Sequence, residues 1–417
     1  MDRSPLPRLT EATLEFQFLV PQGDVDYHPT DKRWFAHTPY QPPLSQGNTH
    51  IEPHPAVFSH LKTIFNAIPL KLKTPSTHHC ETRLWGLDIP TSTWSVTLCP
   101  SAHSEHAGKP SQVLAERYNL AGIQLSSQPY TASDLDYQDV EKVCVALRRE
   151  MRLQISETCS LRVHVSAVGK EGLDEMAVRK GVMLLWVVER LLFGVCAPGR
   201  GEKGGCGMVT GASRLRTAGE FPQTAISERL EGLVPVDVGL DEETLRVLQV
   251  ICRAELLSEL DTLLRGSDSD EFKRLSIEIC PLGGKEGIRF HLHEGTLDPA
   301  MAKLWARVCM AVVQNAMMDD DKFRELFRRI IQHKSADVAY DWAELLIDLG
   351  LPTSDIDAFR KKHMVLQRST RASEGASSPF LPTVKEDKLR IASAEPVTPG
   401  WLLWADGIPW TSMFGSE

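Results

Sequence analysis

The sequence predicts an α+β fold in which a sheet carries helices on one face only. Two observations lead to this prediction. Segments in which apolar and polar residues alternate, a pattern typical of half-buried strands, recur along the chain, and longer amphipathic segments of helical period separate them. The alternating segments also keep their polar residues on one side. The uncovered face of the sheet should therefore be polar, and a polar face in a large domain usually lines a cleft.

The clearest strand prediction falls on residues 13–20 (TLEFQFLV), where apolar residues take every second position and Glu15 and Gln17 lie between them. Residues 161–168 (LRVHVSAV) alternate in the same way. Further strands are predicted at 93–98, 121–127, 275–280 and 288–293.

Helices are predicted wherever apolar residues recur at helical spacing: near 54–67, at 133–151, 173–194, 241–265, 297–318 and 320–333, and in shorter pieces to about residue 364. The helix after residue 297 has the clearest start. Asp298 is a typical N-cap, and Pro299 fits the first helical position, where its missing N–H costs nothing.

The domain organisation predicted from these segments is a single domain over residues 1–365. It contains a loop insertion at 21–60, rich in Pro, His and Gln, and a helical C-terminal part at 297–365. The glycine-rich, basic stretch 197–216 is interpreted as a mobile lid. Residues 366–417 are rich in Ser, Pro and charged residues and are predicted to be a flexible tail with an aromatic end, WLLWADGIPW.

The composition argues against several classes of protein. The chain has 417 residues and a net charge of -9 without a basic stripe, which argues against a nucleic-acid partner. Its nine cysteines include no CxxC pair, so reduced, buried thiols and a cytoplasmic location are expected. No secretory signal is recognised, and the most hydrophobic run, 182–195, contains Glu189 and Arg190 and is too short to span a bilayer. No membrane partner is expected.

The stretch IRFHLHEGTLDP, residues 288–299, contains several candidate functional side chains close together. On a strand Arg289, His291 and His293 would point to the same side, where imidazoles can act as metal ligands. The turn at Gly295 leads into a helix whose N-terminal end favours anions, phosphate included. A metal site, the edge of another active site and an ordinary strand–turn–helix all remain open from these residues alone.

This stretch resembles the closing motif of the amidoligase family, approximately F-R-x-H-x-G-T-L-D, and three more segments resemble the family in the same order. TLEFQFLV is similar to its first strand, G-x-E-x-E-F, and LRVHVSAV to its H-V-H-V-G strand, followed by a long helix with Glu189 and a loop with Pro198 and Arg200. TWSVTLCPSA and GIQLSS resemble its W-x-V-x-x-D-x-S and G-x-E-x-x-S-P segments. Together these matches span about residues 13–315.

The resemblance implies a fold similar to glutamine synthetase and gamma-glutamylcysteine ligase: a curved antiparallel or mixed sheet whose polar concave face forms the site. It also implies an ATP-dependent carboxylate–amine ligase, in which ATP and Mg²⁺ convert a small carboxylate into an acyl phosphate that an amine attacks. Such an enzyme would fit specialised metabolism. The implied catalytic residues are His164, Arg289, His291 and His293, the implied nucleotide-binding residues Arg162, Arg200 and Thr296, and the implied metal-binding residues Glu15, Gln17 and Gln124.

The chain departs from the family pattern where the metal would bind. Gln17, Gln124 and Cys99 stand at positions of expected carboxylates, and an amide brings no charge to a hard dication. His291 stands at the position of the family's arginine, and Arg289, two residues earlier, is expected to reach over toward it.

Two alternatives follow from these departures. The first is a catalytically degenerate relative, a pseudoenzyme that acts as a binding or scaffold protein. The second is an enzyme of another reaction class, in which His164, His291 and His293 bind a transition metal.

Overall fold

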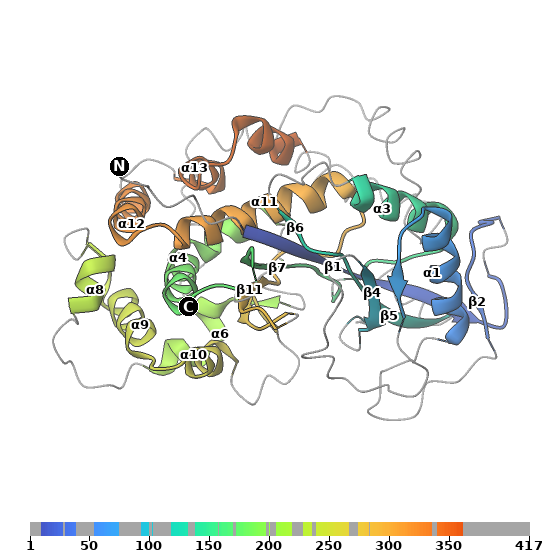
Figure 1. Cartoon of the computed structure of the whole chain (residues 1–417), viewed down its shortest axis with the longest axis horizontal. Coiled ribbons are helices and arrows are strands. Elements are labelled where there is room, and N and C mark those ends of the chain that lie inside the picture. Colours follow the sequence, from blue (N-terminus) through green and yellow to red (C-terminus); the bar gives the residue numbers. More distant parts are fainter. Residues whose placement is uncertain are drawn as a thin grey trace.

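A mixed nine-stranded sheet forms the centre of the part of the chain that the structure describes (Figure 1). The structure is a computed structural model, and it describes residues 10–27, 30–38, 54–74, 93–99, 102, 118–131, 138–156, 158–169, 172–196, 200, 206–218, 228–235, 239–266, 274–282, 284–335 and 340–361.

The long central strand β1 (Thr10–Gly23) organises the sheet, with antiparallel neighbours on both sides. In spatial order the strands are β10 (Ile277–Ile279), β11 (Gly287–Phe290), β7 (Leu161–Ala167), β1, β5 (Asn119–Ser126), β4 (Trp94–Leu98) and β3 (Leu72–Lys73). The short strands β2 (Ala36–His37) and β6 (Tyr130–Thr131) pair with the two ends of β1. The β1–β2 and β3–β4 pairs are parallel, so the predicted mixed sheet within an α+β fold is confirmed. A separate pair joins β8 (Cys206–Gly207) to β9 (Arg274–Leu275).

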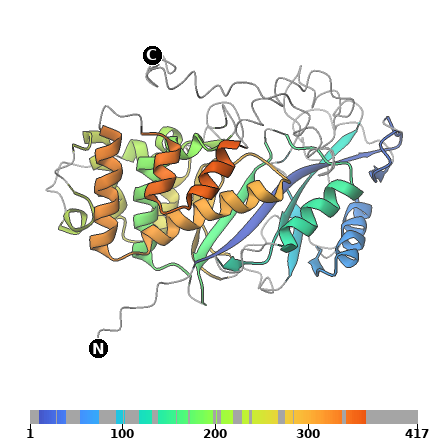
Figure 2. The same cartoon turned by 90° about the horizontal axis from the view of Figure 1, so that it is seen from above.

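The main hydrophobic core lies between the sheet and its helices. Leu14, Phe16 and Phe18 of β1 belong to one buried cluster with Trp305 of α11 (Pro299–Ala316). Figure 2 shows α11 lying along the sheet, and it contacts β1, β7, α3 and α4. The helices have these bounds: α1 Pro55–Ala67, α3 Gln138–Glu150, α4 Glu175–Phe193, α6 Val209–Ala212, α7 Arg214–Thr217, α8 Glu228–Leu233, α9 Glu242–Arg253, α10 Leu257–Leu264, α12 Asp320–Ser335 and α13 Trp342–Asp348.

The other face of the sheet changes character along β1. Glu15 and Gln17 lie on this face, but Leu19, the next residue in the alternation, belongs to a second apolar cluster. That cluster consists of Leu19, Phe35, Cys99, Ala102, Tyr118, Leu120 and Cys159. A Cβ on Gly122 of β5 would lie 2.2 Å from the carbonyl oxygen of Cys99, so the chain after β4 passes directly over this glycine. The expectation of a face that is polar throughout was therefore wrong at this end.

Two predicted segments differ from the structure. The helix expected over 241–265 is interrupted between α9 and α10, although no Gly or Pro marks the break. The guanidinium of Arg179 donates to the carbonyl of Ile251 near the end of α9, a tertiary contact that satisfies a carbonyl left without a partner at a helix end. The stretch 197–216 is not one continuous loop, because β8, α6 and α7 form in its second half.

The remaining expectations are tested only in part. Within 21–60 the structure contains β2 and α1, whereas residues 39–53 lie outside the described residues. The tail 366–417 lies outside them as well. The single domain stays a prediction, although one buried cluster contains residues from Ala12 to Phe359. Within the described residues, none of the helices combines the length and the apolar character that crossing a membrane requires.

Candidate functional site

Arg289 lies at the centre of the polar part of the sheet, between two carboxylates. Its Nη2 is 3.3 Å from Oε1 of Glu15, and its Nη1 donates to Oε2 of Glu278 at 3.3 Å. The three residues come from β11, β1 and β10, and Arg289 and Glu278 are direct partners in the strand register. Burial opposes the charge of Arg289, but the carboxylates of Glu15 and Glu278 raise its pKa above the ordinary value. Arg289 therefore carries a fixed positive charge within the sheet.

Two histidines flank this arginine with different partners. His164 of β7 is the register partner of Arg289, and its Nε2–H donates to the carbonyl of Cys280 at 3.0 Å. Burial, together with the charge of Arg289, lowers the pKa of His164 to about 4, so its imidazole is neutral at pH 7. His291 follows β11, and its Nε2 lies 3.2 Å from Oε2 of Glu278. One carboxylate oxygen of Glu278 thus contacts both Arg289 and His291.

A network of amides and one guanidinium occupies the neighbouring positions on β1, β5 and β7. Gln17 donates from Nε2 to Oε1 of Gln124 at 3.1 Å, and Oε1 of Gln17 accepts from the backbone N–H and the hydroxyl of Ser160 at 3.1 and 2.7 Å. Arg162 donates to Oε1 of Gln124 at 3.1 Å and to the hydroxyl of Ser160 at 3.3 Å. Both amide oxygens are therefore engaged with protein donors.

His293 does not belong to this group. Between the pairs Phe290–Val163 and Glu294–Ser160 there are three residues on one strand and two on the other, which is a β-bulge. The extra residue shifts the alternation, and His293 packs fully buried against Trp305 of α11, with ring centroids 5.3 Å apart. The expectation that His293 shares a face with Arg289 and His291 was wrong for this reason.

The two remaining nucleotide-binding candidates, Arg200 and Thr296, contact the backbone around the bulge. Arg200 donates to the carbonyls of Leu292 and His293, at 3.2 and 3.4 Å. The hydroxyl of Thr296 accepts from the N–H of Asp298 at 3.0 Å, at the start of α11. These contacts fix the strand–turn–helix around the bulge.

Glu189, the glutamate that the family resemblance places on the long helix, binds within the protein. It accepts from the backbone of Val209 and Thr210 at 2.6 and 2.8 Å, at the start of α6, and also from Ser276. Burial raises its pKa despite these hydrogen bonds. We therefore assign Glu189 to the structure of this region and not to the site.

Two contributors to the polar face were missed in the sequence. Glu278 sits in the predicted strand 275–280 (LSIEIC), where Ile277 and Ile279 are buried and Glu278 alternates with them. The alternation and the adjacent predicted strand were a usable signal for its place beside Arg289. Ser160 lies just outside a predicted strand, and no pattern in the sequence marks it.

The residues at the expected metal positions do not fit Mg²⁺. This ion requires several oxygen ligands in octahedral geometry. Of the three expected ligands only Glu15 is anionic, and it faces Arg289, whereas the oxygens of Gln17 and Gln124 already accept hydrogen bonds. A site in which His164, His291 and His293 together bind one metal is not favoured either, because His293 packs against Trp305 of α11 on the helical side of the sheet. Within the described residues, no group of three or more His, Cys, Asp or Glu side chains is placed to hold a metal ion.

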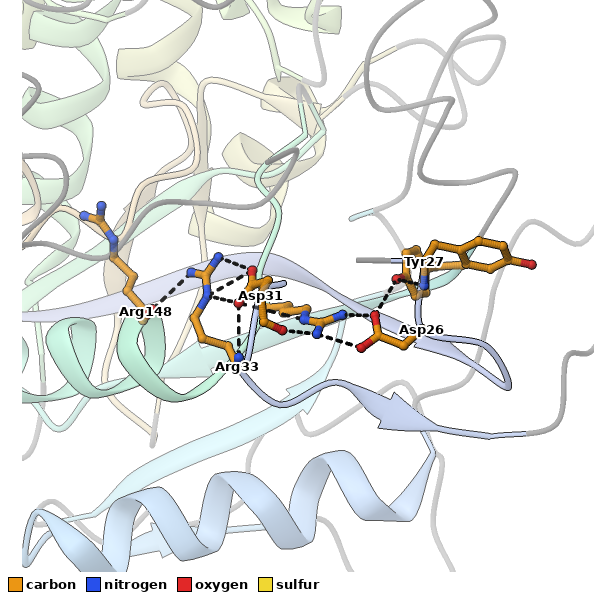
Figure 3. Close-up of polar contacts among 7 residues, drawn as sticks. Asp26, Tyr27, Asp31, Arg33 and Arg148 are labelled. Carbon is orange, nitrogen blue, oxygen red and sulfur yellow. Dashed lines mark hydrogen bonds and ion pairs between the residues drawn. The ribbon is translucent and has the colours of Figure 1, made fainter. Parts of the chain in front are cut away.

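A second polar cluster fixes the turn that follows β1. The guanidinium of Arg152, which is 3% exposed, contacts both carboxylate oxygens of Asp26 at 2.6 and 3.0 Å and donates to the carbonyl of Asp31. It also lies 4.7 Å from the ring centre of Phe35. Arg33 binds the carboxylate of Asp31 and donates to the carbonyl of Arg148 at the end of α3 (Figure 3).

The chain was compared with models of protein families and with curated proteins. Neither comparison finds a match. What can be said of its function therefore depends on the residues and contacts described above.

Proposed function

We propose that this chain is an amidoligase-like pseudoenzyme: a protein that retains a glutamine synthetase-like sheet, polar around Glu15, Gln17 and Arg289, but acts as a binding or scaffold protein without metal-dependent ligation. One observation carries the proposal. The two glutamines at expected metal positions hydrogen bond to each other and to Ser160 and Arg162, so they form part of the folded sheet's own hydrogen-bond network.

The charge balance of the site supports the same conclusion. Two buried cations, Arg162 and Arg289, lie on the face that would have to hold a dication, and Arg289 there contacts the carboxylates of Glu15 and Glu278. A Mg²⁺ ion would be repelled by the two guanidiniums, and its strongly bound water would have to be replaced by neutral amides. The eight cysteines among the described residues are buried, and reduced, buried thiols in a cytoplasmic protein are part of the proposal.

The test restores the carboxylates. In the double variant Gln17→Glu/Gln124→Glu, two new charges join Glu15, so like-charge repulsion should lower the Tm in the absence of metal. Millimolar Mg²⁺ should then raise the Tm of the double variant. At about a hundredfold excess of Mg²⁺ over its Kd, the free energy of unfolding should increase by roughly 2–3 kcal/mol. The wild type should gain no stability from Mg²⁺, with or without ATP.

The matched control is Gln249→Glu on the partly exposed side of α9, which adds a carboxylate away from the sheet. It should respond to Mg²⁺ as the wild type does. A rise in the Tm of the wild-type protein on addition of Mg²⁺ and ATP would contradict the pseudoenzyme proposal.

An active ATP-dependent carboxylate–amine ligase is the second candidate, and one observation favours it. Glu15 is 1% exposed, and its Oε2 has no hydrogen-bond partner among the described residues. A carboxylate oxygen is therefore available beside Arg289. ADP release that depends on both an added small carboxylate and an added amine, and that is lost in Glu15→Gln, would support this candidate over the first.

A further inference from the structure

A single oxygen atom marks the point where two cationic or hydrogen-donating groups of the site converge. Oε2 of Glu278 lies 3.3 Å from Nη1 of Arg289 and 3.2 Å from Nε2 of His291. Guanidinium and imidazole N–H groups that converge on one oxyanion form charge-assisted hydrogen bonds, which are about twice as strong as neutral ones. The same geometry suits the oxygen of a free carboxylate or phosphate.

The two donors are held in place more firmly than the oxygen between them. The side chains of Arg289 and His291 are 8% and 5% exposed, whereas that of Glu278 is 32% exposed. Arg289 also contacts a second carboxylate, that of Glu15, and this contact does not involve Glu278. Glu278 itself stands on β10, the three-residue strand at the end of the sheet order. Glu278 is therefore the most exposed of the three side chains and the one that a ligand from solvent reaches first.

A second cation lies near Glu278 on the outer side. Arg265, whose side chain is 69% exposed, pairs with Asp261 on α10, and α10 packs against β10. The charge of Glu278 acts on both members of this pair. A Glu278 side chain that leaves Arg289 thus moves near an ion pair in which Arg265 attracts its charge and Asp261 repels it.

We propose that Arg289 and His291 form a binding site for one oxyanion of a small carboxylate or phosphate compound, and that Glu278 occupies this site as an internal competitor which the ligand displaces. The inference deepens the proposed function, because it names a ligand class for the binding protein and a built-in limit on its affinity. A tethered carboxylate acts at an effective concentration on the order of millimolar, so weakly bound anions do not displace it.

The experiment compares Glu278→Gln with Glu286→Gln, a control that removes one charge from the turn between the same two strands. Binding of acetate and of inorganic phosphate is measured by titration calorimetry at constant ionic strength. In Glu278→Gln at least one of the two anions should bind about tenfold more tightly or better, since the carboxylate that competes for Arg289 and His291 is removed. In Glu286→Gln both should bind as in the wild type. The anion that gains more distinguishes a carboxylate ligand from a phosphate ligand.

Two further variants keep the test decisive. Glu278→Asp shortens the side chain by one methylene and should also bind the preferred anion more tightly, so it replaces Glu278→Gln if that variant does not fold. Addition of Arg289→Gln to Glu278→Gln should remove the gain. Equal binding in Glu278→Gln and Glu286→Gln, or a gain that persists without Arg289, would overturn the inference. Neither result depends on Mg²⁺, so failure here is separable from failure of the proposed function.

Discussion

At the scale of single residues, three buried cations of this protein lie beside carboxylates. Arg289 faces Glu15, Arg152 binds Asp26, and Lys180 lies 2.6 Å from Asp320. A cation removed from water loses hydration energy, which only a well-placed partner and further hydrogen bonds can offset. Loss of one partner therefore costs more than the pair itself contributes to stability.

The pair of Arg152 and Asp26 gives a direct test of this argument. Replacement of Arg152 by Ala removes two contacts to Asp26, the hydrogen bond to the carbonyl of Asp31 and the packing on Phe35. We expect the free energy of unfolding in urea to fall by about 3 kcal/mol, at the lower end for a buried pair because Asp26 is 29% exposed. Arg149→Ala, whose side chain is 62% exposed, should change it by about 0.5 kcal/mol or less. Equal losses in the two variants would contradict the structural role of this cluster.

At the scale of elements, the turn and helix after His293 connect the polar face to the main core. Asp298 caps α11 by accepting from the N–H groups of Ala300 and Met301, at 2.9 and 3.3 Å. This cap was predicted from the sequence, and the structure confirms it. The helix begins beside the bulge, so its first turn helps to fix the position of the residues that follow Arg289.

The contribution of the Asp298 cap to stability can be measured with a conservative substitution as the control. Asp298→Ala should lower the free energy of unfolding by about 1 kcal/mol, because two N–H groups lose their acceptor. Asp298→Asn keeps a side-chain oxygen at the same place and should lose only a few tenths of a kcal/mol. If the Asn variant is destabilised as much as the Ala variant, the charge of Asp298 matters and the hydrogen bond does not.

The features that the sequence predicted well are those with a local cause. The alternation of apolar and polar residues in 13–20 predicted β1, and the Asp298-Pro299 pair predicted the start of α11. The bulge between Phe290 and Glu294 has no local signal, because it depends on the register with a strand more than a hundred residues earlier. The contact of Ser160 with Gln17 likewise depends on pairing between distant strands, whereas Glu278 meets Arg289 across the neighbouring strands β10 and β11. The strands and helices were therefore predictable from the sequence, but the side-chain contacts between distant strands were not.

At the scale of the whole molecule, the buried polar face links stability to pH. His164 is fully buried and neutral, and burial, with the charge of Arg289, lowers its pKa to about 4 from 6.5. The unfolded chain binds a proton on this imidazole near pH 6.5, whereas the folded chain does so only near pH 4. The contribution of His164 to stability is therefore complete above about pH 6.5 and is lost as the pH falls from there toward 4.

The size of this effect follows from the two pKa values. Between pH 7 and pH 5 the wild type should lose about 2 kcal/mol more than His164→Gln, which cannot be protonated but can still donate to the carbonyl of Cys280. Urea unfolding at the two pH values measures the difference. His333→Gln serves as the control, because its imidazole lies on the surface of α12 beside Asp348 and is 52% exposed. A wild-type protein whose stability falls no more steeply than that of His164→Gln would show that folding does not lower the pKa of His164.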